Sequence, residues 1–217
     1  MPYRKIPLAI NELYHVCTKS IAGFTIFNNP REYDRMLGAM DFYSLEKPPC
    51  SYSVLKKCPT KLLEIKKSIK SSKKCVRIIA YCLMPTHVHF ILEQFSQNGI
   101  SNFMNLLLKS YSKYFNKKHK RKGPLWEGPF KNILIKKEDQ FIHLTRYMHL
   151  NPVTAHIVDK PENWSYSSYR AYIQIVKSNL CDFSDYFDMA VVEYIEFVNN
   201  AIDYQRQLAK IKHLILE

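Results

Sequence analysis

The sequence predicts an α+β protein, and two kinds of hydrophobic pattern favour this fold class. Short apolar runs typical of strands lie at 13–18, 76–93 and 133–135. Between and after these runs, apolar residues recur at intervals of three and four, as they do on one face of a helix. The chain has 217 residues, 47% of them hydrophobic, which suits one domain with a helical tail.

The first third of the chain predicts a strand, a helix and a basic segment. The strand at 13–18 contains His15, and a single strand histidine is more often a packed or solvated residue than a ligand. Asn29 and Pro30 are typical of a helix start. A lysine-rich segment follows, with a short helix expected from Thr60; it is either a solvated face or a surface for phosphates.

The run from Val76 to Glu93 predicts two strands separated at Pro85, because proline cannot donate to a ladder. We expect a turn or bulge there. Side chains alternate along a strand, so His87 and His89 point to the same face, with Cα atoms about 6.5–7 Å apart. Imidazole is a common metal ligand, and a strand holds two of them rigidly.

A helix is expected to start at Ser101 and to end at a basic cluster before Gly123. The aromatic segment 124–130 and the strand at 133–135 follow. Basic residues interleaved with Trp and Phe are what a groove for single-stranded nucleic acid needs, although packing of Trp126 in the core explains the pattern equally well.

The next helix is expected from Lys137 to Asn151, closing before Pro152. His143, Tyr147 and Asn151 lie four residues apart, so they share one face, with Asn151 at the fraying end. A final helix is expected over roughly 189–216.

Composition indicates a partner and a compartment. The formal net charge is +13, which favours a polyanion, above all nucleic acid. The six cysteines form no CxxC pair, so we expect reduced thiols in a cytoplasmic protein. No signal core or membrane span is predicted, and no membrane partner is expected.

Two strand histidines alone can be half of a zinc site, part of a catalytic metal site or satisfied core residues. Asn151 strengthens the catalytic alternative, because an amide oxygen completes three ligands and leaves positions open for a phosphate oxygen or water. Tyr147 lies one turn earlier, and a phenol beside a cation can attack phosphorus. Tyr111 and Tyr114 compete with Tyr147 for the role of nucleophile.

Four motifs, in this order along roughly residues 10–172, resemble one family. The segment 81–92 with its His-Val-His core resembles the paired-histidine motif of HUH single-strand endonucleases, and 146–153 resembles the tyrosine helix of their single-tyrosine transposases. The segments 123–128 and 164–169 are similar to REP-associated tyrosine transposases, relatives of the insertion-sequence-200-like transposases. At 129 and 130 the chain has Pro-Phe, where that family leads us to expect an arginine followed by an aromatic residue.

The resemblance implies a ferredoxin-like antiparallel sheet with helices packed on one face. It implies that His87, His89 and Asn151 bind a divalent ion, Mg²⁺ or Mn²⁺. Tyr147 would attack single-stranded DNA, giving a 5′-phosphotyrosine link and a free 3′-hydroxyl. Because imidazole suits later transition metals, the ligand chemistry favours Mn²⁺ over Mg²⁺.

The expected domains are an HUH-type transposase domain at 1–172, with a basic insertion near 47–75, and a helical extension at 173–217. The expected role is a transposase that cuts and rejoins DNA near hairpins, in a bacterial-type cytoplasm at the nucleoid. A hairpin-binding protein without cleavage and a metallonuclease that uses water remain alternatives, and a homodimer that exchanges helices is left open. The candidate DNA-binding residues are Lys109, Lys113, Lys117, Lys118, Lys120, Arg121, Lys122, Trp126 and Arg146.

Overall fold

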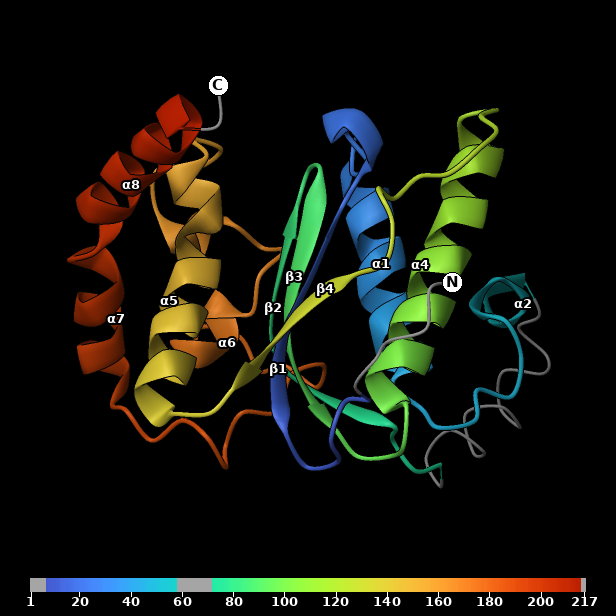
Figure 1. The fold of residues 1–217 in the computed structure, drawn as a ribbon, viewed down its shortest axis with the longest axis horizontal. Helices are drawn as coiled ribbons and strands as arrows, with labels where there is room; N and C mark the ends of the chain where they lie inside the picture. The colour runs from blue at the N-terminus through green and yellow to red at the C-terminus, as the bar shows by residue number, and fades with distance from the viewer. Residues whose placement is uncertain (1–6, 58–71, 216–217) are drawn as a thin grey trace.

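The computed structural model describes residues 7–57 and 72–215, and shows a sheet between two layers of helices (Figure 1). The elements are, in chain order, β1 (Leu13–Lys19), η1 (Ile21–Gly23), α1 (Pro30–Tyr43), α2 (Tyr52–Lys57), β2 (Val76–Met84), β3 (His87–Gln94), α4 (Gly99–Lys118), β4 (Lys131–Ile135), α5 (Glu138–Thr154), η2 (Pro161–Asn163), α6 (Tyr169–Tyr172), α7 (Val191–Asn199) and α8 (Ile202–Ile215).

The sheet is four-stranded with the order β2-β3-β1-β4, and every neighbouring pair is antiparallel. Together with the chain order β1-α1-β2-β3-α4-β4, this is the ferredoxin-like arrangement. The predicted fold class is therefore confirmed. The strands β1 and β3 occupy the centre of the sheet, so each of them is paired with a neighbouring strand on both edges.

Helices cover both faces of the sheet, not one face alone. The helices α1 and α4 lie on one side, and α5 with the C-terminal helices lies on the other (Figure 1). The reason is visible in β3, where Val88 and Phe90 belong to one core and Ile91 belongs to the other. Because both faces are apolar, each one needs a layer of helices.

Two predicted helix ends are wrong. The helix α4 begins at Gly99, with Asn98 before it at a φ of 60°, so Ser101 lies inside the first turn and does not cap it. The helix α5 continues through Pro152 to Thr154. Pro152 lacks an amide hydrogen for the helix ladder, but the Ala155 amide still donates to the Asn151 carbonyl at 2.9 Å. Asn151 is thus held inside the helix.

The C-terminal extension forms two helices where one was expected. The break falls at Asn200 and Ala201, where the Ala201 amide donates to Val198, three residues back. Tyr194 and Val198 of α7 are fully buried in the core that also contains β2 and α5. The extension therefore packs against the tyrosine helix.

The separation of strands at Pro85 is confirmed, since β2 ends at Met84 and β3 begins at His87. The irregularity in the ladder lies elsewhere, between Ile78 and Ala80. The helix expected from Thr60 lies outside the described residues. Within 7–57 and 72–215, no helix is long and apolar enough to cross a membrane.

Candidate active site

The two histidines of β3 lie on the face of the sheet that α5 covers. Their ring centroids are 5.0 Å apart and their planes meet at 83°. His87 is half-buried, while His89 is 7% exposed. Their neighbours Val88 and Phe90 are fully buried in the opposite core, which fixes the face to which the histidines point.

The helix α5 brings Tyr147 to the same place, from the same chain. The Tyr147 ring lies 6.1 Å from the His89 ring, edge to face at 88°. Asn151, one turn later, is 9% exposed, and its Nδ2 is buried with no hydrogen-bond partner among the described residues. A buried N–H donor without a partner is costly, and an acceptor such as a phosphate oxygen or water would satisfy it.

His15 joins the pair, although the sequence alone favoured a non-ligand role for it. Its Nε2 lies 3.1 Å from the Nδ1 of His89, and the two rings stack at 5.3 Å with planes 3° apart. The pairing of β1 with β3 sets this contact, because Cys17 lies opposite His89 and His15 follows on the same face. The contact between His15 and His89 therefore arises from strand pairing, because the two residues are far apart in the sequence.

The hydrogen bonds of the rings leave one nitrogen on each for a further ligand. The Nδ1 of His87 lies 3.0 Å from the Thr86 hydroxyl, and the Nδ1 of His89 faces His15. Burial, and then the charge of Lys19, lowers the pKa of His87 to about 4. Burial chiefly lowers the pKa of His89 well below its usual range, with His87, His15 and Lys19 adding to it. Both rings are therefore neutral near pH 7, as metal ligands must be.

The two histidines fit a divalent ion. An ion about 2.1 Å from one nitrogen of each ring, at an angle of about 90–110°, places the ring centroids about 4.6–5.4 Å apart. The observed separation of 5.0 Å lies inside this interval. Two imidazoles and an amide oxygen suit Mn²⁺ better than Mg²⁺. No cluster of three or more His, Cys, Asp or Glu side chains in the described part of the chain offers an alternative site.

Tyr147 differs from its rivals in its surroundings. Burial raises its pKa, and the nearby thiols of Cys17 and Cys82 add to the shift. The phenol therefore needs a cation to become a good nucleophile. Tyr111 is 1% exposed, and its hydroxyl donates to the Ile26 carbonyl at 2.6 Å. That hydroxyl stabilises the loop before α1 and cannot reach a substrate.

Most of the candidate DNA-binding residues lie along α4 and just after it. Lys109, Lys113 and Lys117 are exposed at intervals of four, so they form one strip on the helix. Lys120 and Lys122 are exposed beyond its end. We call these five exposed residues the lysine strip.

The remaining four candidates are engaged with the protein. Lys118 pairs with buried Glu32 at 2.7 Å. The guanidinium of Arg121 donates to the Asn116 side chain at 3.1 Å and to the Pro124 carbonyl at 2.7 Å. The half-buried Trp126 indole donates to the Leu108 carbonyl at 3.3 Å. The guanidinium carbon of Arg146 lies 4.1 Å from the centre of the Phe197 ring, on the other side of the sheet from the lysine strip.

A hollow of about 260 Å³ adjoins the site between α5 and α8. It is lined by His143, Arg146, Tyr147, Asn151, Thr154, Ala201, Tyr204, Gln205, Leu208 and Ala209. The side chain of Gln205 donates to the Tyr147 carbonyl at 3.1 Å. The helix α8 thus holds the backbone of the tyrosine turn.

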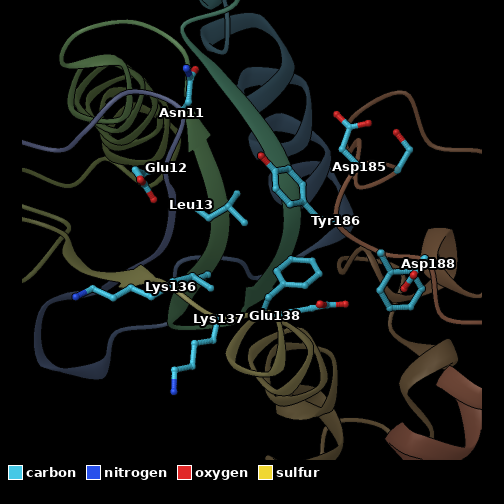
Figure 2. Close-up of a pocket in the computed structure, with 13 residues that line it drawn as sticks. Asn11, Glu12, Leu13, Lys136, Lys137, Glu138, Asp185, Tyr186 and Asp188 are labelled. Atoms are coloured by element: carbon cyan, nitrogen blue, oxygen red, sulfur yellow. The ribbon is translucent and has the colours of Figure 1, made fainter.

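A larger hollow of about 450 Å³ lies at the start of α5, with Lys136, Lys137, Glu138, Asp185 and Asp188 around it (Figure 2). It is remote from the histidines, since Leu13 at its floor and Lys19 beside His87 are at opposite ends of β1. Six residues of strand span about 20 Å. Its charges have both signs and do not converge on one point, so the paired histidines define the candidate site.

The sequence also missed what holds α5 in place. His149 is fully buried; its Nδ1 lies 2.7 Å from the Tyr194 hydroxyl, and its Nε2 lies 2.8 Å from the Ser168 hydroxyl. The Ser168 hydroxyl also accepts from the Tyr81 amide of β2 at 3.0 Å. This chain of hydrogen bonds joins the tyrosine helix to the strand beside β3. The sequence signal for these hydrogen bonds was the histidine at position 149, between Tyr147 and Asn151.

The fold and the site together define a ferredoxin-like α+β protein with paired histidines beneath a tyrosine helix. Residues 50–151 match the family described as IS200-like transposases. This is the family, the insertion-sequence-200-like transposases, that the motifs of the chain resemble, and the match covers just under half of the chain. The family is one of DNA transposases, enzymes that cut and rejoin DNA.

One solved structure supports the fold. A REP-associated tyrosine transposase bound to a REP hairpin is similar to this chain with a TM-score of 0.51 and 15% identity, over 88% of this chain and 99% of that one. A putative transposase from Deinococcus radiodurans aligns with a TM-score of 0.34 and 14% identity, over 67% of this chain and 95% of that one. No curated protein matches the chain significantly.

Proposed function

We propose that this protein cuts and rejoins single-stranded DNA beside a hairpin, with Tyr147 as the nucleophile. The observation that carries the proposal is the 6.1 Å approach of the Tyr147 ring to His89 within one chain. The family supplies the reaction class, and the hairpin bound to the structurally similar transposase supports the choice of DNA.

The reaction exchanges one ester for another. The Tyr147 oxygen bonds to phosphorus, and the bond from phosphorus to the 3′-oxygen breaks. The phenol loses one proton, and the leaving 3′-oxygen takes up one proton. The product is a 5′-phosphotyrosine link with a free 3′-hydroxyl. Because a phosphodiester is kept, attack by a 3′-hydroxyl on the link rejoins DNA without a nucleotide cofactor.

His87, His89 and Asn151 are the residues that would hold a divalent ion beside Tyr147. When bound, such an ion stabilises charge on the phosphate and favours the phenolate. The chain itself contributes neutral imidazoles, a buried setting that limits water, and a phenol fixed on α5. Without the ion, the raised pKa of Tyr147 keeps the phenol protonated near neutral pH.

We further propose that the lysine strip and Arg121 bind the phosphates of the DNA. Most of the strip lies on α4. After α4 ends, residues 123–127 lead back to the end of β1 that lies beside His87. There the Glu127 amide donates to the Lys19 carbonyl at 3.0 Å, and Lys19 pairs with His87 across the sheet. DNA that follows the strip is thereby led towards the candidate active site.

The test is a covalent adduct between the protein and a labelled hairpin DNA with an unpaired flank, formed with Mn²⁺ and separated on a denaturing gel. We expect an adduct with the unaltered chain, none with Tyr147→Phe and none after chelation of the ion. Tyr204→Phe is the matched control, since Tyr204 is 62% exposed in the same hollow, and we expect it to retain the adduct.

An adduct that persists in Tyr147→Phe would contradict the assignment of the nucleophile. Tight hairpin binding by the unaltered chain, with no adduct in any divalent ion, would favour a binding protein without cleavage. Free 5′-phosphate ends with no attached protein would favour a nuclease that uses water.

A further inference from the structure

An exposed aromatic turn stands at the same end of the sheet as the histidines. The turn η1 and the residue after it, Phe24, join β1 to α1, and Phe24 is 46% exposed. Ala22 and Gly23 both have left-handed backbone, with φ of 51° and 65°. A non-glycine residue costs about 1 kcal/mol or more in this region, and such strain persists only where the surrounding structure imposes it.

Both ends of the turn are anchored beside His87. The Ser20 amide donates to the Thr86 carbonyl at 2.8 Å, and the Ile26 amide donates to the Pro85 carbonyl at 2.8 Å. These two acceptors form the connection between β2 and β3, immediately before His87. Figure 1 shows the turn at the tip of the sheet, between the connection of β2 with β3 and the end of α4. The turn is therefore held next to the candidate active site.

The Phe24 ring is close to one cation, Arg121, and to one other aromatic ring, Phe115. Phe115 meets it edge to face, with centroids 5.9 Å apart at 88°. The Arg121 guanidinium carbon lies 5.5 Å from the ring centre. Arg121 is itself held by neutral acceptors, the Asn116 side chain and the Gly123 and Pro124 carbonyls. Its positive charge therefore has no carboxylate partner in the described chain, while its position is fixed.

A single exposed phenylalanine is common on protein surfaces, and Phe95 is a second one against which Phe24 can be compared. Phe95, at the other end of β3, is 39% exposed and also has an arginine 5.5 Å away, Arg77. Arg77, however, is paired with Glu93 at 2.6 Å and with Asp185 at 2.6 Å. The charge of Arg77 is neutralised by these carboxylates, whereas Arg121 pairs with no carboxylate in the described chain and has Lys120 and Lys122 as its sequence neighbours.

We propose that Phe24 and Arg121 form a stacking platform for an unpaired nucleobase of the DNA strand next to the phosphate that is cut. This inference deepens the proposed function and rests on it. An aromatic face accepts any base, and the guanidinium of Arg121, which lies over the Phe24 ring, offers its charge to the adjoining phosphate. The platform selects DNA with an unpaired strand at the foot of a hairpin, because bases in a closed duplex are already stacked on each other.

The test compares two DNAs, a hairpin with a short unpaired flank and the same hairpin with a blunt end. The full chain carrying Tyr147→Phe is the parent, so that binding is measured without cleavage, by fluorescence anisotropy. Adding Phe24→Ala should weaken binding of the flanked hairpin about 5- to 100-fold and leave the blunt hairpin unchanged. Phe24→Trp should restore binding, and Phe95→Ala is the matched control, with both affinities unchanged.

Equal affinity of Phe24→Ala and the parent for the flanked hairpin would overturn the platform. An equal loss on both DNAs, with normal thermal unfolding, would overturn the selection for unpaired bases. If the parent binds neither DNA, the platform and the DNA-binding role fall together. If binding follows the expected pattern but the unaltered chain forms no adduct, only cleavage by Tyr147 is overturned.

Discussion

His89 is the residue on which the candidate active site depends, because three other rings meet it. His15 stacks on it, His87 and Tyr147 meet it at nearly right angles, and it is almost fully buried. A shift of one residue in β3 would move it to the opposite core. The alternation of His87, Val88, His89 and Phe90 at the start of this strand therefore sets the face on which both histidines lie.

We expect His15→Phe to weaken Mn²⁺ binding about 10- to 100-fold, because a residue that orients a ligating histidine has effects of this size. The Nε2 of His15 lies 3.1 Å from the Nδ1 of His89, and when the Nδ1 of His89 donates to His15, the Nε2 of His89 is left for the ion. Calorimetric titration with Mn²⁺ measures the affinity without DNA or cleavage.

The matched control is His156→Asn, because His156 is exposed and asparagine tolerates its φ of 53°. An affinity of His15→Phe equal to that of the control would show that His15 only fills space.

At the scale of elements, a buried ionic contact joins the helix that carries the lysine strip to α1. The Glu32 carboxylate is fully buried and lies 2.7 Å from both the Lys118 ammonium and the His119 ring. Its other oxygen accepts from the Asn28 amide at 2.7 Å, as an acidic residue at a helix start commonly does. Burial raises the pKa of Glu32, but the hydrogen bonds from Lys118, Asn28 and His119 outweigh it and lower the pKa to about 2.

This lowered pKa predicts a dependence of stability on pH. A carboxyl that titrates near 4.5 when exposed and at about 2 in the fold stabilises the fold above pH 4.5, and the effect disappears as the pH falls towards 2. Glu32→Gln should therefore lower the free energy of unfolding by about 2–3 kcal/mol at pH 7, and by less at pH 3. Urea unfolding at both pH values measures this difference.

Glu127→Gln, on an exposed loop, is the control and should have little effect at either pH. A destabilisation by Glu32→Gln that is the same at pH 7 and pH 3 would show that shape, not charge, makes the contact.

Some elements could be predicted from the sequence because their signals are local. The strand of His87 and the helix of Tyr147 follow from spacings of two and four along the chain. The contact of His15 with His89 could not be predicted, because it depends on how β1 pairs with β3. The continuation of α5 past Pro152 also depends on packing, since Met148, Leu150 and Val153 are buried around it. Packing overrides the local preference of proline.

At the scale of the whole molecule, the positive charge is not placed uniformly with respect to the site. The lysine strip and the turn at Phe24 lie on the side of α1 and α4, and the chain from the strip leads to the histidine end of β1. Lys136 and Lys137 lie at the opposite end of β1, on the other side of the larger hollow from Asp185 and Asp188 (Figure 2). The two sets of lysines therefore allow one surface to be tested against the other.

Each lysine that contacts a phosphate adds about one unit to the salt dependence of DNA binding, because it releases a counterion. We expect Lys109→Gln, Lys113→Gln and Lys117→Gln each to lower the slope of log K against log salt concentration by about one. Lys136→Gln and Lys137→Gln should leave it unchanged. Equal slopes for both sets, from titrations at several salt concentrations, would show that DNA does not follow α4.

The position of Tyr147 beside the histidines of its own chain has a consequence for stoichiometry. Under the proposed mechanism, Tyr147 of one chain can hold one DNA end at a time, and Tyr111 is sealed in the core. An exchange between two broken ends therefore takes two chains, or two successive turnovers of one chain. A second copy would add a second end, and not a missing part of the first site.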